Sequence, residues 1–367
     1  MDNLVKLTKI LEENDLTDLI IISPENIEYF LGVETVADSL ALLHISRDGY
    51  ASIYVPVLEY YRFKDSLNSK KIKVYGVSRK LKPEDASIVS KSWKDIAKEI
   101  IDKGNRIGID RSHSSPLSGI LHGITSEKIV DVSNKINKYR MIKEDWEIEA
   151  IVHAIEITGK AIYDVVNNLS ENTTETEVAG IFEYNVRKEG IRRYAFEPLI
   201  LFKPGNSYPH NLPSNTRLGD KNLVLLDVGV KYRERCSDIT RMVIWGSISE
   251  EEKKVIEIVN EAINRALETI QPGVKAGEVD KAARSYIEEK GYGNRFIHGL
   301  GHGIGVVVHE QPYIRKDNET ILEPGMVFTV EPGIYIPGKY GVRIEEDVLV
   351  TKDGVKVLSS NIERVFT

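Results

Sequence analysis

Five potential metal ligands in the C-terminal part of the chain are the side chains whose types and spacing carry the most chemical information. They are Asp227, Asp238, His302, Glu331 and Glu345. Four carboxylates and one imidazole form a mainly hard, oxygen-rich donor set, which indicates two neighbouring divalent cations of the Mn, Co, Fe or Zn kind and not a thiolate site. Two such ions a few ångströms apart would activate a water molecule and hold the carbonyl that it attacks.

Apolar strand segments must position the two aspartates. The segment NLVLLDVG (222–229) predicts a buried strand, and burying Asp227 in it costs several kcal/mol unless a positive charge meets the carboxylate. Asp238 lies in CSDITRMVIW, so a hairpin that turns around residues 231–235 would bring both carboxylates to one face. Taken singly, each aspartate is also explained as a turn or capping residue.

Glycines and a second apolar strand position the next two ligands. The segment FIHGLGHGIG (296–305) contains four glycines, which permit positive φ angles and a close approach of the backbone, so that His302 can point inward. The neighbouring His298 has an equally good interpretation as a structural histidine. The strand segment MVFTVEP (326–332) ends on Glu331.

In GVRIEEDVLV (341–350), strand alternation predicts that Arg343 and Glu345 share one face. An arginine beside a metal site either binds a substrate carboxylate through two hydrogen bonds or neutralises the acidic cluster. His309, in HEQP, has an alternative interpretation as a surface loop histidine.

Composition excludes several other classes of protein. The 367 residues are 41% apolar and 29% charged, which is ordinary for a globular protein with two domains, and no apolar run approaches the ~18–20 residues of a membrane span. The net charge of −7 argues against a nucleic-acid partner. The amphipathic N-terminus lacks the features of a secretory signal, and the single Cys236 agrees with a reducing compartment, so we expect a cytoplasmic protein.

The order of the patterns predicts an α/β unit followed by an α+β unit, with the boundary near residue 135. In the first unit we expect a strand at 18–23, a helix after Ser23-Pro24, and a hairpin of strands 38–46 and 50–57 around Arg47-Asp48-Gly49. In the second we expect helices at 146–169, 174–189, 249–269 and 276–290, with strands in 195–246 and 320–352.

Taken together, the segments LLDVG, SDITR, HGLGHGIG, HEQP, TVEPGIY and GVRIEEDV resemble the signature of the pita-bread metallopeptidases, more specifically the Xaa-Pro dipeptidases (prolidases) and Xaa-Pro aminopeptidases. SPENIEYFLGV is similar to the N-terminal domain of that group, and YRMIKEDWEIEAI to the entry into its catalytic domain. The resemblance implies a creatinase/prolidase-like domain over 1–134. It also implies a catalytic domain over 135–367, with helices over a curved antiparallel sheet.

The resemblance also implies roles for the site residues. Asp227 would bind one metal, Asp238 and Glu345 would bridge two, and His302 and Glu331 would complete the second site, with Mn or Co as the ions. A hydroxide between the metals would attack the carbonyl before proline, with Glu331 as the proton shuttle. His210, in YPHNLPS, and His309 would contact the substrate carbonyl or the intermediate, and Arg343 would grip the terminal carboxylate of a dipeptide.

Two departures from the family pattern bear on specificity. Relatives carry an aromatic residue where this chain has Arg235, and small residues where it has Phe202-Lys203-Pro204, and we expect both departures beside the pocket. The short N-terminal domain, and the homodimer that the resemblance implies, favour a dipeptidase.

Three alternatives to a dipeptidase stay open. The first is an Xaa-Pro aminopeptidase that acts on longer peptides, and the second is a metal-free peptide-binding module. In the third, a purely structural interpretation, the five acidic and histidine side chains only cap turns.

Overall fold

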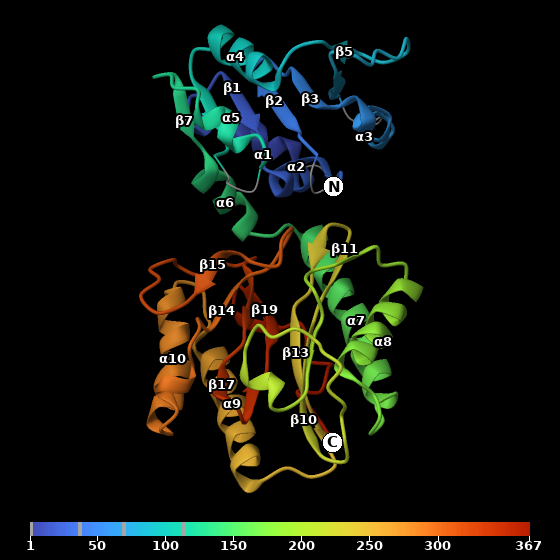
Figure 1. Cartoon of the computed structure of the whole chain (residues 1–367). Coiled ribbons are helices and arrows are strands. Elements are labelled where there is room, and N and C mark those ends of the chain that lie inside the picture. Colours follow the sequence, from blue (N-terminus) through green and yellow to red (C-terminus); the bar gives the residue numbers. More distant parts are fainter. Residues whose placement is uncertain (1–2, 36–38, 68–70, 112–114) are drawn as a thin grey trace. The chain divides into compact units, whose positions relative to one another are not determined.

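The computed structural model describes residues 3–35, 39–67, 71–111 and 115–367, which form two compact units, Met1–Tyr139 and Arg140–Thr367 (Figure 1). Helix α6 (Ser133–Met141) spans the expected boundary near residue 135, and the division at 134/135 stays a prediction. In the described part of the chain, no helix is long and apolar enough to cross a bilayer.

The first unit is built on one mixed sheet of seven strands in the order β5-β4-β3-β2-β1-β6-β7. Neighbours β1–β2 and β2–β3 are antiparallel, whereas the outer pairs are parallel. The strands are β1 (Asp18–Ile21), β2 (Leu42–Ser46), β3 (Ala51–Pro56), β4 (Lys73–Val77), β5 (Ile88–Val89), β6 (Ile107–Ile109) and β7 (Ile129–Asp131). The helices, besides α6, are α1 (Leu4–Glu13), α2 (Pro24–Leu31), α3 (Tyr60–Ser66), α4 (Trp93–Lys103) and α5 (Ser118–His122), with η1 at Val57–Glu59.

Local sequence signals account for these elements. Ser23 caps α2 by accepting a hydrogen bond from the Asn26 amide at 3.2 Å. The predicted hairpin is confirmed as β2 and β3, with Gly49 at φ +88° in the turn; residues 36–38, where its first strand was expected to begin, lie outside the described residues. Isoleucines of β1, α4 and β6 pack in one apolar cluster.

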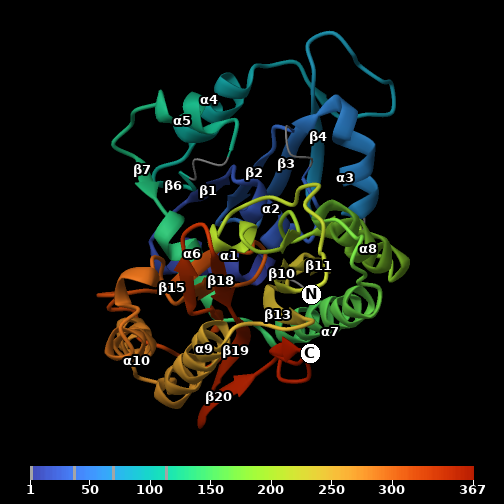
Figure 2. The same cartoon turned by 60° about the horizontal axis from the view of Figure 1, so that its bottom comes forward.

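The second unit contains two pairs of long helices, as predicted. They are α7 (Asp145–Asn167), α8 (Glu175–Lys188), α9 (Glu250–Thr269) and α10 (Ala276–Glu289). Thr174 with Glu177 and Ser249 with Glu252 form capping boxes at the starts of α8 and α9. Figures 1 and 2 show α7 and α8 on one side of the central strands and α9 and α10 on the other.

Antiparallel pairing dominates the sheets of this unit. One sheet has the order β21-β13-β10-β9 and another β15-β14-β16-β19-β20, with two smaller sheets, β12-β11-β8 and β17-β18. The first strands are β8 (Arg193–Tyr194), β9 (Leu199–Leu201), β10 (Asn222–Val228), β11 (Val230–Tyr232), β12 (Arg235–Cys236) and β13 (Ile239–Trp245). They are followed by β14 (Gly301–Gly303), β15 (Glu310–Ile314), β16 (Val327–Val330), β17 (Gly333–Ile336), β18 (Tyr340–Arg343), β19 (Glu346–Thr351), β20 (Gly354–Val357) and β21 (Val365–Phe366). Short 3₁₀ turns are η2 (Gly205–Ser207) and η3 (Gly293–Arg295).

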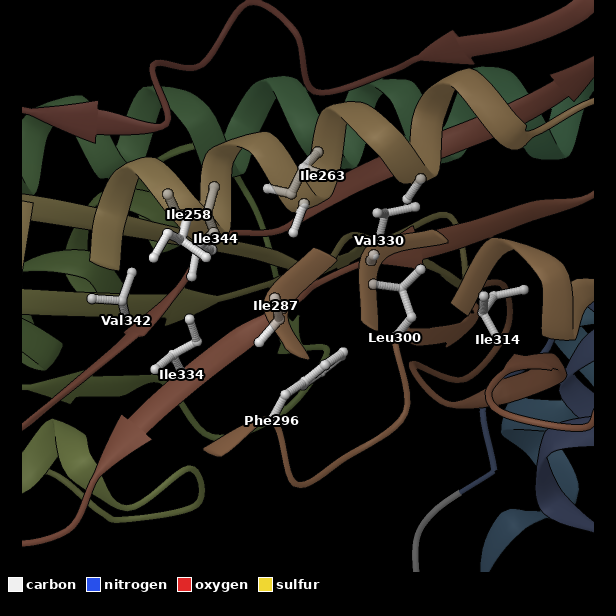
Figure 3. Packing of buried hydrophobic residues seen from close by; sticks show 14 of the residues in the cluster. Ile258, Ile263, Ile287, Phe296, Leu300, Ile314, Val330, Ile334, Val342 and Ile344 are labelled. Carbon is white, nitrogen blue, oxygen red and sulfur yellow. The ribbon is translucent and has the colours of Figure 1, made fainter. Parts of the chain in front are cut away.

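A large apolar cluster joins the second helical pair to the strands. Ile258 and Ile263 of α9 and Ile287 of α10 pack with Val330 and Val342, and all five are almost fully buried (Figure 3). Burial of this kind is worth roughly 1.5–3 kcal/mol for each large apolar side chain. The α/β unit followed by an α+β unit with antiparallel sheets confirms the predicted fold class.

The continuous strand expected over 341–350 is interrupted. β18 ends at Arg343 and pairs with β17, whereas β19 begins at Glu346 and pairs with β16. The chain changes partner between them, which leaves Glu345 outside both strands.

Candidate active site

A cavity of about 570 Å³ in the second unit collects all five predicted ligands. Each comes from a strand or a strand end: Asp227 lies on β10, Asp238 precedes β13, His302 lies on β14, Glu331 follows β16, and Glu345 lies between β18 and β19. The cavity wall also contains the three predicted substrate residues, His210, His309 and Arg343.

The predicted hairpin brings the two aspartates together. β10 pairs with β13 in a register that sets Asp227 opposite Thr240, and the connecting turn has positive φ at Arg233 (45°) and Glu234 (58°). Two such residues match a two-residue hairpin turn, which fits the right-handed twist of the strands.

Three of the ligands are close enough to share one ion. The donor atoms of Asp238, His302 and Glu345 lie within 4.8 Å of one another. His302 Nε2 lies 3.6 Å from Asp238 Oδ2 and 3.2 Å from Glu331 Oε1, so the imidazole connects two carboxylates.

Burial of several neighbouring carboxylates shifts their pKa values. Burial raises the pKa of Asp238 and of Glu345 well above their ordinary values, and the neighbouring carboxylates add to both shifts. Burial also raises the pKa of Asp227, although Arg343 opposes the shift. Glu331 differs, because the hydrogen bond and charge of His302 outweigh its burial and lower its pKa to about 2.

The donor set fits divalent cations. Among the described residues, Asp227 Oδ1 and Glu345 Oε1 are buried and have no hydrogen-bond partner. Buried carboxylate oxygens of this kind destabilise a protein unless a charge meets them, and oxygen-rich sites suit hard divalent ions. Asp227 Oδ2 pairs with Arg343, which leaves Oδ1 as the oxygen available to a metal ion.

Each guanidinium nitrogen of Arg343 has a partner in the protein. Its Nη2 pairs with Asp227, Nη1 donates to the Tyr335 hydroxyl at 2.9 Å, and Nε donates to Thr240 Oγ1 at 3.2 Å. The side chain is only 5% exposed. This arrangement supports the alternative in which Arg343 neutralises the acidic cluster.

The cavity histidines differ in their surroundings. His309 stacks edge-on against His302 with ring centroids 4.2 Å apart, and burial, with the charges of His302 and His210, lowers its pKa to about 4. His298 Nε2 lies 3.0 Å from the Tyr335 hydroxyl, and burial lowers its pKa. His210 is exposed at the cavity wall.

Three residues that orient the ligands were not predicted. Thr240 donates to Glu345 Oε2 at 2.8 Å, Thr329 donates to Glu331 Oε1 at 3.2 Å, and Tyr335 hydrogen-bonds Arg343 and His298. Each threonine lies two positions from an acidic ligand in an otherwise apolar strand segment. Strand alternation therefore contained the signal that these threonines face the site.

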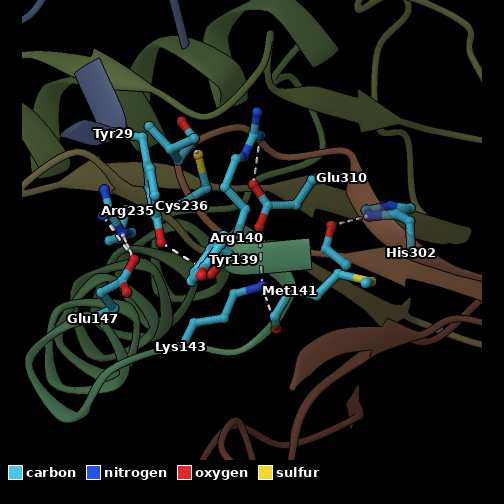
Figure 4. Close-up of polar contacts among 12 residues, drawn as sticks. Tyr29, Tyr139, Arg140, Met141, Lys143, Glu147, Arg235, Cys236, His302 and Glu310 are labelled. Carbon is cyan, nitrogen blue, oxygen red and sulfur yellow. Dashed lines mark hydrogen bonds and ion pairs between the residues drawn. The ribbon is translucent and has the colours of Figure 1, made fainter. Parts of the chain in front are cut away.

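The two departures from the family pattern make contacts outside the cavity wall. Arg235 is buried and donates to Glu147 at 2.8 and 2.9 Å (Figure 4). Its guanidinium also lies over the Trp146 ring. Phe202 is fully buried, and Lys203 pairs with Glu252 at 2.9 Å. Neither Arg235 nor 202–204 is among the described residues that line the cavity, so a direct effect of either departure on the substrate stays a prediction.

A buried ion-pair cluster is centred on Glu310, the residue that follows His309. Glu310 accepts from Arg140 Nη2 at 2.7 Å and from Lys143 Nζ at 3.0 Å (Figure 4). A Cβ atom added to Gly305 would lie 2.3 Å from Glu310 Oε1, so the carboxylate packs against the glycine-rich segment that contains His302. Burial opposes ionisation of Glu310, but Lys143 and Arg140 outweigh it and lower the pKa from 4.5 to about 2.

This shift gives a prediction for acid stability. A carboxyl whose folded pKa lies below its unfolded value stabilises the fold fully above about pH 4.5 and loses that contribution as the pH falls through about 2. We expect the unfolding free energy of the native protein to fall in this window, with Glu310 contributing on the order of 3 kcal/mol. Denaturant titrations across pH should give a shallower acid limb for Glu310→Gln. Glu319→Gln, which removes an exposed partner of Lys275, should keep the native slope, and equal slopes for all three proteins would contradict the assignment.

The fold and this cavity define a metallohydrolase, and comparison with known proteins identifies which kind. The chain belongs to metallopeptidase family M24, which matches residues 149–352, and residues 4–142 match the creatinase/prolidase N-terminal domain. The second unit thus has the pita-bread fold, and the family implies a dinuclear metal site, which the buried acidic cluster fits.

The chain is similar along its whole length to proteins of this group. It is 36% identical over 360 residues to the Xaa-Pro dipeptidase of Pyrococcus furiosus, covering 98% of this chain and 97% of that protein. The solved prolidase from Pyrococcus furiosus matches with a TM-score of 0.82 at 35% identity, over 96% of this chain and 98% of that one. The X-Pro aminopeptidase from Thermotoga maritima matches with a TM-score of 0.86 at 31% identity, over 100% and 99%.

Proposed function

We propose that this protein is an Xaa-Pro dipeptidase that hydrolyses the peptide bond before a C-terminal proline. The observation that carries the proposal is the convergence of five ligand-type side chains, with two unpartnered buried carboxylate oxygens, in one cavity of an M24 fold. We assign the metal set to Asp227, Asp238, His302, Glu331 and Glu345, which would hold two divalent ions, Mn or Co.

Divalent ions in this site would supply Lewis acidity that activates water and polarises the scissile carbonyl. The protein's own residues would do the rest. Glu331, at the cavity surface, would take the proton from the attacking water and deliver it to the leaving proline nitrogen. His309 and His210 would donate hydrogen bonds to the carbonyl oxygen as it becomes an oxyanion.

Recognition of the substrate's carboxyl end separates a dipeptidase from an aminopeptidase. All three guanidinium nitrogens of Arg343 are engaged, by Asp227, Thr240 and Tyr335, which weakens its proposed role as the carboxylate clamp. Arg315, just beyond β15, also lines the cavity. Within the described chain its guanidinium has no hydrogen bond or ion pair, and it lies over the Tyr313 ring at 5.6 Å. We therefore assign the carboxylate of the dipeptide to Arg315.

Loss of this arginine should weaken binding of the dipeptide. A hydrogen bond to a charged group contributes about 1.5–3 kcal/mol, so Arg315→Gln is expected to raise KM for an Xaa-Pro dipeptide about 10- to 100-fold with a small change in kcat. Lys316→Gln changes an adjacent exposed cation outside the cavity wall and should leave KM unchanged. An unchanged KM in Arg315→Gln would remove Arg315 from the substrate site.

The assignment as a whole is tested with two substrates. Metal-stripped protein, then protein supplied with Mn or Co, is given an Xaa-Pro dipeptide and a tripeptide with proline second. Metal-dependent cleavage of the dipeptide alone supports the dipeptidase, and preference for the tripeptide indicates an Xaa-Pro aminopeptidase. Absence of metal-dependent cleavage of either peptide would contradict the dipeptidase and support a metal-free peptide-binding module. The proposal includes a cytoplasmic homodimer, whose mass light scattering would measure.

A further inference from the structure

The segment that carries His210 is a long connection with almost no secondary structure of its own. It joins β9 to β10 and contains only the short turn η2 before it contributes Pro209, His210 and Leu212 to the cavity wall. His210 makes no hydrogen bond to another side chain or backbone group in the described part of the chain. Its place in the cavity therefore depends on how the backbone of the connection is held.

One buried carboxylate holds both ends of this connection. Glu175, the first residue of α8, is 2% exposed. Its Oε1 accepts from the Phe202 amide at 2.6 Å, before His210. Its Oε2 accepts from the amide and the hydroxyl of Ser214 at 2.8 and 2.6 Å, after His210. All three contacts are good hydrogen bonds by distance, and together they close the connection into a loop.

Neighbouring contacts reinforce the two ends, while the middle of the connection has weaker support: the Gly338 amide donates to Ser207 Oγ at 3.2 Å, and Arg343 Nη1 lies 3.5 Å from Pro209 O. The Glu175 amide donates to Thr216 O at 3.1 Å, and Thr176 donates twice to Ser214 O. Before His210, Asn206 is fully buried; its side chain donates to Leu223 O at 2.7 Å and accepts from the Gly341 amide at 3.1 Å. The loop is thereby tied to α8, β10 and β18.

We propose that Glu175 is a positioning residue for catalysis, which acts by fixing the loop that presents His210 to the substrate. The inference rests on the proposed role of His210. A glutamine at position 175 keeps the size of the side chain but replaces one acceptor oxygen with a donor. Whichever way the amide turns, its NH₂ group faces a backbone N–H of Phe202 or of Ser214, so one end of the loop is released.

Kinetics of a double-mutant cycle test the coupling. With an Xaa-Pro dipeptide and Mn-loaded protein, Glu175→Gln is expected to lower kcat/KM on the order of 10- to 100-fold, as small misplacements of catalytic groups do. In a His210→Ala background the same change should lower it less than about 2-fold, because the group that Glu175 positions is already gone. Equal effects in the two backgrounds, or a native rate in Glu175→Gln, would overturn the proposal.

A matched control separates positioning from helix stability. Glu177 lies in the same first turn of α8 and accepts hydrogen bonds from the amide and hydroxyl of Thr174, but its carboxylate is exposed and, among the described residues, forms no hydrogen bond with the loop. Glu177→Gln should therefore leave kcat/KM unchanged. Ser214→Ala removes one of the three bonds without changing charge, and it should shift kcat/KM in the same direction by a smaller factor if Glu175→Gln does not fold.

Hydrogen exchange distinguishes failure of this inference from failure of the proposed function. Amides of residues 203–215 should exchange faster in Glu175→Gln than in the native protein or in Glu177→Gln, whatever the substrate is. Unchanged exchange overturns the loop anchor itself. Faster exchange together with a native rate in His210→Ala would retain the anchor and overturn the role assigned to His210.

Discussion

Asp238→Asn is expected to lower kcat/KM for an Xaa-Pro dipeptide by at least about 100-fold. Loss of a residue that only supports a metal ligand costs about 10- to 100-fold, and loss of a ligand itself should cost at least as much. Asp238 lies within 4.8 Å of the donor atoms of His302 and Glu345, so its loss removes a charged oxygen from the centre of the acidic cluster. The same change should affect stability in opposite directions with and without metal.

Without metal, the asparagine relieves repulsion among buried carboxylates that raise one another's pKa, so Tm should increase. With Mn, the native protein should gain about 2.7 kcal/mol at a metal concentration 100 times Kd, and the variant should gain much less. Calorimetry with and without a chelator measures both effects. Asp353→Asn, in the exposed turn between β19 and β20, should match the native protein in each condition, whereas a native metal response in Asp238→Asn would exclude this residue from the metal set.

Arg235→Met should destabilise the fold by about 3–5 kcal/mol, because it leaves the buried Glu147 carboxylate without its guanidinium. The side chains of Arg235 and Glu147 are 1% and 2% exposed, and Arg235 also lies 4.7 Å from the Trp146 ring centroid. Urea titrations monitored by far-UV circular dichroism measure the change.

Arg265 offers a matched surface control for this ion pair. It pairs with Glu261 at 3.1 Å and lies 4.6 Å from the Tyr286 ring centroid, but its side chain is 50% exposed. Arg265→Met should cost less than about 1 kcal/mol. Similar losses in both variants would show that burial of the Arg235 pair does not determine its contribution. Since Arg235 is not among the described residues that line the cavity, the Arg235→Met protein that remains folded should keep its KM.

The short-range patterns of the chain predicted much of the architecture. The helices expected over 174–189 and 249–269 are confirmed as α8 and α9, which begin after the capping residues Thr174 and Ser249, and the strand patterns around Asp227 and Asp238 predicted their hairpin. These predictions succeed because capping, turn formation and strand alternation depend on residues a few positions apart.

Contacts between distant segments were harder to predict. Arg343 and Glu345 both reach the cavity, yet they do so across a break between β18 and β19 where the chain changes strand partner. The alternation rule describes faces of one strand and contains no information about which strand lies opposite. For the same reason it did not reveal that Arg343 is engaged by Asp227 and Tyr335.

The sequence by itself determined the family and the four long helices of the second unit, and it predicted the ligand set, because each depends on residue identity and on local periodicity. The tertiary structure alone decided that Arg235 faces Glu147, that Arg315 is the arginine in the cavity wall free of ion pairs within the described chain, and that Glu175 holds the His210 loop. Those outcomes depend on which segments pack together, and the burial that results determines whether a charge must find a partner in the protein or remains available to a substrate.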